Sequence, residues 1–206
     1  MERLLPSDVD ALLFDLGGVI LEIDFTRAFA AWASAAGVAA DAIATRFAFD
    51  SAYAAHERGE IGAVEYFASL RHSLELELSD EQFAAGWNTV IVGEIPGMRA
   101  LLAAAARARP LHLFSNTGEV HRRHWETRYR EVLQPFARRF LSCEIGLRKP
   151  DPEAFAWVAR RVGLAPQRIA FFDDTAANVA GARTAGLRAF HVRSPAEVAA
   201  ALQLSS

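Results

Sequence analysis

The sequence predicts an α/β protein in which a mostly parallel sheet is covered by helices on both faces. Short apolar runs bounded by turn residues alternate with segments that carry helix start and stop signals. Strands that alternate with helices in this way form three-layer α/β/α folds. A run of predicted helices between about 24 and 95 has no place in that alternation. We therefore expect a sheet core with a small helical insert.

The apolar runs and the capping residues define the elements of the core. Short, fully apolar runs with polar flanks are typical of buried strands, and here they are Ala11–Phe14, Leu111–Phe114, Arg139–Cys143, Ile169–Phe172 and Arg188–Val192. Proline near a helix start and glycine after its end are typical signals. They predict helices over Gly97–Arg107, from Pro152 to just before Gly163, over Ala176–Ala185, and after the capping box Ser194–Glu197.

The chain between the first two strands is much longer than one crossover helix needs. It contains four further helical patterns, Thr26–Ala36, Ala40–Ala54, Ala63–Leu74 and Ser79–Val92. We therefore expect an α/β core domain made of residues 1–22 and 96–206. A helical cap domain, residues 23–95, would be inserted after the first strand and stand over its end.

The composition excludes several classes of protein. With 206 residues, 52% of them hydrophobic, the chain can bury a sizeable core. A net charge of -3 gives no general attraction to nucleic acid or anionic membranes, and the longest uncharged stretch, Ala28–Ala40, is too short for a membrane span. One cysteine and no apolar signal core lead us to expect a cytoplasmic protein without nucleic-acid or membrane partners.

Polar residues follow the predicted strands at the point where each strand ends. They are Asp15 after the first strand, Ser115-Asn116 after the second, Lys149 beyond the third and Asp173-Asp174 after the fourth. Carboxyl ends of parallel strands share one edge, which is where open α/β folds bind ligands. Each residue alone also fits a helix cap, a turn or a solvated loop. Together they predict one site at that edge.

This set of side chains suits phosphoryl transfer through a covalent intermediate. A carboxylate such as Asp15 can attack phosphorus and form an aspartyl phosphate, which water then hydrolyses. Because the two reacting groups are both anionic, a cation is needed, and carboxylate and carbonyl oxygens favour Mg²⁺. The expected metal ligands are Asp15, Asp174 and the Gly17 carbonyl, and the expected contacts to the phosphoryl oxygens are Ser115, Asn116 and Lys149.

Four motifs occur in a fixed order: FDLGGV, FSNT, RKPDPEAF and FFDDTAANVAGA. With them the chain resembles the haloacid dehalogenase-like superfamily from residue 11 to about 192. The stretches FDSAYAAHERGEIGAVEYF, FDLGGVILEIDF and HRRHWETRY are similar to the branch with bacterial α-D-glucose-1-phosphate phosphatases and the N-terminal phosphatase domain of soluble epoxide hydrolases. The resemblance implies a Rossmann-like core with a cap. It also implies a Mg²⁺-dependent hydrolase of a small phosphorylated metabolite, such as glucose 1-phosphate.

The resemblance also implies roles for individual residues. Asp15 would be the nucleophile and a metal ligand, together with the Gly17 carbonyl and Asp174. Asp173 and Asn178 would support the shell around the metal. Ser115 and Lys149 would bind the phosphoryl group.

Gly17 departs from the usual pattern of this superfamily, in which a second Asp acts there as general acid and base. Such help is typically worth roughly 10²–10⁴-fold in rate. Asp24, His56 or Glu57 from the insert are candidates to replace it, and the resemblance places His56 and Glu57 in contact with the substrate. Two alternatives stay open: a 2-haloacid dehalogenase with the same nucleophile, and a non-catalytic binding protein.

Overall fold

The computed structural model describes residues 8–204 of the chain. Its central sheet is parallel and has the strand order β5-β4-β1-β6-β7. These strands are β1 (Ala11–Phe14), β4 (Leu111–Ser115), β5 (Phe136–Leu141), β6 (Ile169–Asp173) and β7 (Arg188–His191). The predicted α/β class and its parallel sheet are confirmed.

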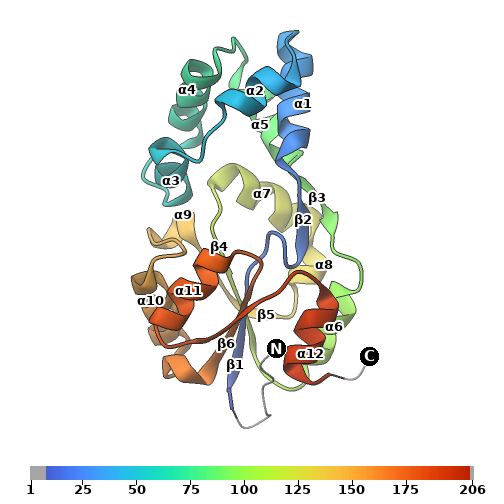
Figure 1. Cartoon of the computed structure of the whole chain (residues 1–206), viewed down its shortest axis with the longest axis vertical. Coiled ribbons are helices and arrows are strands. Elements are labelled where there is room, and N and C mark those ends of the chain that lie inside the picture. The colour runs from blue at the N-terminus through green and yellow to red at the C-terminus, as the bar shows by residue number, and fades with distance from the viewer. Residues whose placement is uncertain (1–7, 205–206) are drawn as a thin grey trace.

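Successive residues of the strands face opposite sides of the sheet, so each strand contributes to two cores. Leu12 and Phe14 pack on one side, against α6 (Met98–Ala106), α8 (Arg130–Leu133) and α12 (Pro195–Leu202). Leu13 and Phe171 pack on the other, against α10 (Pro152–Val162) and α11 (Ala176–Thr184). Figure 1 shows these two helical layers on either side of the sheet. A 3₁₀ turn, Pro166–Arg168, leads into β6.

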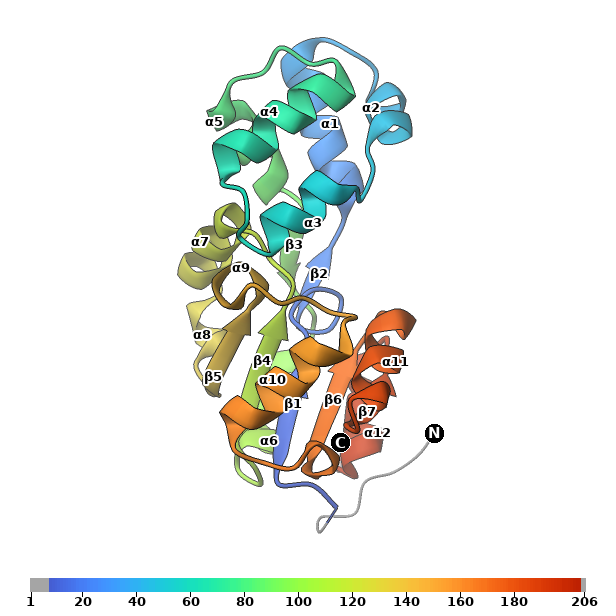
Figure 2. The ribbon, with the colours of Figure 1, turned by 90° about the vertical axis from the view of Figure 1, so that its left-hand side faces the viewer.

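Five helices stand over the carboxyl edge of the sheet (Figure 2), and we call them the helical insert. They are α1 (Phe25–Ala36), α2 (Ala40–Arg46), α3 (Ser51–Glu57), α4 (Ala63–Leu74) and α5 (Asp80–Asn88). Their own apolar core is rich in aromatic rings, with Trp32 and Trp87 stacked 5.6 Å apart at its centre. The insert therefore has a hydrophobic core distinct from the two cores of the sheet.

The structure corrects three of the predicted elements. The helix expected over 40–54 is two helices, because the chain is extended at Phe47 and Asp50 caps α3 by accepting a hydrogen bond from Tyr53 N. The strand expected at 139–143 begins at Phe136 and ends at Leu141, where α9 (Ser142–Ile145) follows. α7 (Glu119–Arg128) lies between the sheet and the insert (Figure 1).

The third correction concerns the end of the insert. The helix expected over 79–92 stops at Asn88, and Ile91–Glu94 forms β3, which pairs antiparallel with β2 (Leu21–Ile23). Adjacent β-branched residues, Val90, Ile91 and Val92, favour a strand over a helix. This small two-stranded sheet carries the chain from the core into the insert and back.

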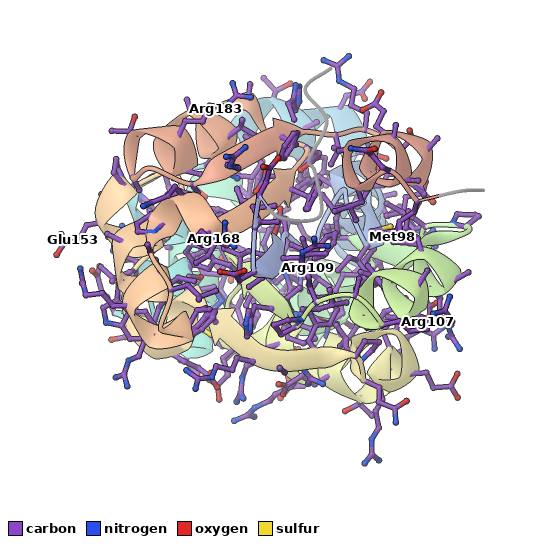
Figure 3. All side chains as sticks on the ribbon, turned by 90° about the horizontal axis from the view of Figure 1, so that it is seen from below. Met98, Arg107, Arg109, Glu153, Arg168 and Arg183 are labelled. Carbon is purple, nitrogen blue, oxygen red and sulfur yellow. The ribbon has the colours of Figure 1, made fainter. Side chains whose placement is uncertain are left out.

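The opposite end of the sheet is fixed by two arginines. Seen from below, Arg109 and Arg168 lie at the start of β1 (Figure 3). Arg109 Nε donates to Val9 O at 2.8 Å, and Arg168 forms two hydrogen bonds with Asp10, at 2.6 and 2.7 Å. These bonds fix the start of β1, and Asp15 follows the end of the same strand.

Within residues 8–204, no helix has both the length and the apolar character that a membrane span requires.

Candidate active site

The carboxyl ends of three neighbouring strands bring the predicted polar residues together. β1 is the central strand, with β4 and β6 on its two sides, so Asp15 lies between Ser115 and the pair Asp173-Asp174. Asp15 Oδ1 accepts a hydrogen bond from Leu16 N at 2.7 Å, and Asp15 N donates to Phe172 O at 2.9 Å. The backbone thus fixes both the position and the direction of this carboxylate.

Lys149 is the buried cation of the site. Its Nζ lies 2.7 Å from Asp15 Oδ1 and 2.7 Å from Asp173 Oδ2, and only 1% of its side chain is exposed. Burial disfavours the charge on Lys149, but the two carboxylates outweigh this and raise the pKa of the ammonium above its usual value. The rings of Phe114 and Phe171 lie 5.6 and 5.5 Å from Nζ and add cation–π attraction.

Asn116 positions the segment that carries Lys149. Its Nδ2 donates to Lys149 O at 2.8 Å, and its Oδ1 accepts from Lys149 N at 2.9 Å. The amide nitrogen and the amide oxygen of Asn116 are therefore both bonded to the backbone of Lys149. Asn116 lines the cavity, but its side chain is occupied in joining the end of β4 to the Lys149 loop.

Asp173 and Asp174 have different surroundings despite being adjacent. Asp173 is fully buried and accepts from Lys149 Nζ, from Asn178 Nδ2 at 3.0 Å and from Thr175 N at 2.8 Å. Asp174 is exposed toward the cavity, and its closest described side-chain partner is Thr175 Oγ1 at 3.5 Å. Asp174 is therefore the carboxylate that remains open to a ligand, and Asn178 holds its neighbour in place.

The second of the two glycines after Asp15 makes room for Asp174. Gly18 has a φ of +73°, and a Cβ there would overlap the Asp174 carboxylate. A glycine is needed at this position for both reasons. Gly17 is less constrained, since a Cβ would lie 3.0 Å from Ile23 Cγ1, a movable side-chain atom.

The carboxylates outnumber the cations that contact them. One oxygen each from Asp15, Asp173 and Asp174 lies within 4.8 Å of the others, whereas the single ammonium of Lys149 contacts two of them. Three negative charges and one positive charge leave an excess of two. Burial is the main reason that the pKa values of Asp15 and Asp174 are raised, and the charge of Asp173 adds to it. A divalent cation with a preference for oxygen fits this donor set.

A cavity of about 440 Å³ lies above these residues and is roofed by the insert. Its floor is polar and its walls are largely apolar, with aromatic side chains from both parts of the chain. The sequence-predicted residues that line it are Asp15, Gly17, Glu57, Ser115, Asn116, Lys149, Asp174 and Asn178.

The structure does not bring His56 into this cavity, contrary to expectation. His56 is buried against Tyr66, with ring centroids 4.6 Å apart, and its Nδ1 lies 3.4 Å from Ile61 O. It lines a separate cavity of about 240 Å³ beside Cys143. Neighbouring residues of a helix point about 100° apart, so the same turn of α3 directs Glu57 to the site and His56 away from it.

The other two candidates for the missing acid are also committed elsewhere. Asp24 caps α1, where its Oδ1 accepts from Thr26 N at 2.9 Å and from Thr26 Oγ1 at 2.6 Å. These bonds lower the pKa of Asp24. Glu57 accepts from Arg148 Nη2 at 2.6 Å. Glu57 is thus an ion-pair partner and an acceptor at the cavity wall.

Sequence reasoning missed several residues that line the cavity. Phe49 and Tyr53 come from the insert, and Arg148 and His121 come from the core. His121 Nε2 donates to Trp87 O at 2.8 Å, and burial is the main cause that lowers its pKa to about 4. All four residues lie in stretches that carry the family resemblance, Arg148 directly before Lys149. Nothing in those stretches indicates that the four side chains meet, because only the docking of the insert brings them to the site.

Comparisons with known proteins agree with this geometry. The family model of the haloacid dehalogenase-like hydrolases matches residues 9–186. Phosphatase MT3486 of Mycobacterium tuberculosis is 30% identical over 199 residues, which cover 89% of this chain and 87% of that protein. Enolase-phosphatase E1 of Streptomyces avermitilis is 32% identical over 104 residues, or 50% of this chain and 42% of that protein.

A solved structure shares the whole architecture. The HAD family enzyme bt-2542 of Bacteroides thetaiotaomicron, crystallised with magnesium and inorganic phosphate, aligns with a TM-score of 0.77 at 28% identity. The alignment covers 88% of this chain and 93% of that one. The likeness therefore extends over the sheet and the insert together.

Proposed function

The chain belongs to the haloacid dehalogenase-like hydrolase family, and from that premise we propose that it is a Mg²⁺-dependent phosphatase of a small phosphorylated metabolite. We further propose a sugar phosphate, such as glucose 1-phosphate, as its substrate. One observation carries the proposal: three carboxylates cluster at the carboxyl edge of the sheet, and one buried ammonium contacts two of them. That excess of negative charge requires a cation before a phosphate can approach.

The residues divide the reaction between them. Asp15 attacks phosphorus, the bond from phosphorus to the leaving-group oxygen breaks, and an aspartyl phosphate forms; water then cleaves it and restores Asp15. Lys149 and Ser115 hold the phosphoryl oxygens, and Asn116 fixes the Lys149 loop. Asp15, Asp174 and the Gly17 carbonyl would hold Mg²⁺, which supplies charge neutralisation and orientation for the phosphoryl group.

The relatives support the metal and the reaction. The enzyme bt-2542 was crystallised with magnesium and phosphate, and the similar protein of Mycobacterium tuberculosis is named a phosphatase. A 2-haloacid dehalogenase would use the same nucleophile on carbon and gain nothing from an open carboxylate at Asp174. A non-catalytic binding protein would have no use for the Lys149–Asp15 contact of 2.7 Å at a nucleophile.

The proposal includes a division into a core domain, residues 1–22 and 96–206, and a cap domain, residues 23–95. The separate aromatic core of the insert supports this division. The contacts that hold the cap over the site include the ion pair of Glu57 with Arg148 at 2.6 Å and the hydrogen bond of His121 with Trp87 O at 2.8 Å. The residues that the cap contributes to the cavity would take part in substrate specificity.

The test is phosphate release from a panel of phosphorylated metabolites, with Mg²⁺ and with EDTA. We expect release that requires Mg²⁺ and disappears in Asp15→Asn, which keeps the side-chain shape but removes the nucleophile. Asp41→Asn, the same change on the exposed face of α2, is the matched control and should stay active. Halide release from a 2-haloacid without metal would instead establish the dehalogenase, and binding of phosphate esters without turnover would establish the binding protein.

A further inference from the structure

We infer that Arg148 and Phe49 form the subsite that binds the leaving group, and that this subsite selects a hydroxylated ring. The inference rests on the proposed function and extends it to the part of the substrate beyond phosphate. Neither residue has a role in the chemistry described above. Both line the cavity that contains Asp15.

Arg148 places a charged donor group at the cavity wall. Its Nη2 lies 2.6 Å from Glu57 Oε2, which anchors the guanidinium against α3. The side chain is nevertheless 28% exposed, and Arg148 lines the cavity. A guanidinium that is held by one carboxylate and still exposed at a cavity can donate to an oxygen of a ligand there.

The position of Arg148 fits a ligand that is held by its phosphate. Arg148 is the residue directly before Lys149, whose Nζ contacts the nucleophile. The guanidinium therefore belongs to the cavity wall next to the phosphate-binding end, where the group attached to the phosphate would lie. Glu57, which is 5% exposed, keeps the guanidinium oriented and is itself an acceptor at that wall.

Phe49 supplies the apolar half of the subsite. It is 64% exposed, although three aromatic neighbours hold its ring: Phe25, Phe47 and Tyr53, with centroids 5.2, 5.4 and 5.0 Å away. Phe25 and Tyr53 line the same cavity, so the three rings form one aromatic wall, and ligand cavities are typically lined by such walls with a few polar groups. This wall can cover the apolar face of a ring.

The two residues together define the class of leaving group. A sugar ring presents C–H groups on its faces and hydroxyl oxygens around its edge, so it can meet an aromatic surface and a charged donor at the same time. An aryl group lacks the hydroxyls, and a small acyl group lacks the ring. The subsite should therefore contribute more to kcat/KM for a hydroxylated ring phosphate than for either of the other two.

The experiment compares kcat/KM for glucose 1-phosphate, p-nitrophenyl phosphate and acetyl phosphate, each with Mg²⁺. The first ratio is kcat/KM for glucose 1-phosphate divided by kcat/KM for acetyl phosphate, and the second is kcat/KM for p-nitrophenyl phosphate divided by the same value. We expect Arg148→Met to lower the first ratio at least 10-fold and the second less than 3-fold. Phe49→Ala should lower both ratios at least 5-fold. Glu57→Gln, which keeps the Arg148 donor, should lower the first ratio less than Arg148→Met does. Val64→Ala, an exposed apolar residue of the insert outside the cavity lining, is the control and should leave both ratios unchanged.

The possible outcomes distinguish failure of the proposed function from failure of the proposed subsite. If the wild type releases phosphate from none of the three substrates, the proposed function fails. If it turns over acetyl phosphate but Arg148→Met and Phe49→Ala leave the ratios unchanged, the proposed function stands and the subsite is refuted. Equal losses on all three substrates, with unfolding monitored by circular dichroism, would mean that both residues are merely structural, and would also overturn the inference.

Discussion

The two glycines that follow Asp15 differ in what they tolerate. Gly18→Ala places a Cβ at positive φ and against the Asp174 carboxylate, whereas Gly17→Ala meets only Ile23 Cγ1, at 3.0 Å. A left-handed non-glycine residue costs roughly 1–2 kcal/mol. We expect Gly18→Ala to lower the free energy of unfolding by at least about 1 kcal/mol more than Gly17→Ala, in urea titrations. It should also weaken Mg²⁺ binding, because Asp174 must move. Equal effects of the two substitutions would contradict this reading.

Asp174 should dominate metal affinity because it is the carboxylate open to the cavity. Asp174→Asn removes one negative charge from the cluster and keeps the size of the side chain. Loss of a group that only supports a metal ligand already costs roughly 10–100-fold in affinity. For loss of a ligand itself we therefore expect the Mg²⁺ dissociation constant, measured by calorimetry, to rise at least about tenfold. The control is Asp41→Asn, far from the cluster on α2. Unchanged affinity in Asp174→Asn would remove this residue from the proposed ligand set.

At the scale of elements, α11 approaches the Lys149 loop so closely that a side chain cannot fit between them. A Cβ at Gly181 would overlap Pro150 O. Helix propensity alone predicts that alanine stabilises a helix over glycine by about 1 kcal/mol, but overpacking costs roughly 1–3 kcal/mol. We therefore expect Gly181→Ala to lower both the stability and, by displacing the loop, the turnover. Gly93→Ala is the control, since nothing described lies within 4 Å of its Cβ position. A stabilised, fully active Gly181→Ala would refute the close contact.

The contact between α7 and the insert should make stability sensitive to acid. Burial, the main cause, lowers the pKa of His121 from 6.5 to about 4, so the unfolded chain binds a proton on this residue before the folded one does. Its neutral form is retained above pH 6.5, and stability should fall as the pH drops from about 6.5 to about 4. The loss from this residue is at most about 3 kcal/mol. Urea unfolding at several pH values gives the free energy of unfolding as a function of pH. Between about pH 4 and 6.5 this free energy should change less steeply with pH in His121→Gln than in the control His72→Gln, whose histidine is exposed on α4. The same slope in both variants would exclude His121 as its source.

At the scale of the whole molecule, none of the three insert side chains considered as replacements for the missing acid is free at the cavity, and His121, which does line the cavity, donates its Nε2 proton to Trp87 O. Among the described residues, His56 lies in another cavity, Asp24 caps α1, and Glu57 is paired with Arg148. The charge on the departing oxygen must then be borne mainly by the leaving group. We expect the rate of enzyme phosphorylation to fall steeply as leaving-group pKa rises across a series of phosphate monoesters. Asp24→Ala and His56→Ala should leave that slope unchanged. A flat slope in the wild type would mean that another group donates the proton.

The sequence by itself determined the class of the fold and the origin of the site. Apolar runs at β1, β4, β6 and β7 and capping signals at α10 and α12 are local, so they could be found without tertiary information. The end of each strand placed Asp15, Ser115 and Asp174 at one edge, because parallel strands must align their carboxyl ends. The break between α2 and α3 and the strand β3 had weak local signals, the cap Asp50 and the β-branched run at 90–92, but the pairing of β3 with β2 depends on a partner distant in the chain.

Only the tertiary structure decided which groups surround the substrate. That α3 turns Glu57 toward the cavity and His56 away from it depends on the packing of His56 on Tyr66. That Lys149 satisfies both Asp15 and Asp173, while Asp174 stays open, depends on side-chain distances of 2.7 Å that no spacing in the sequence encodes. The reason is physical: a strand end fixes where a backbone stops, but charge balance, burial and hydrogen-bond partners arise only when segments far apart in the chain pack together.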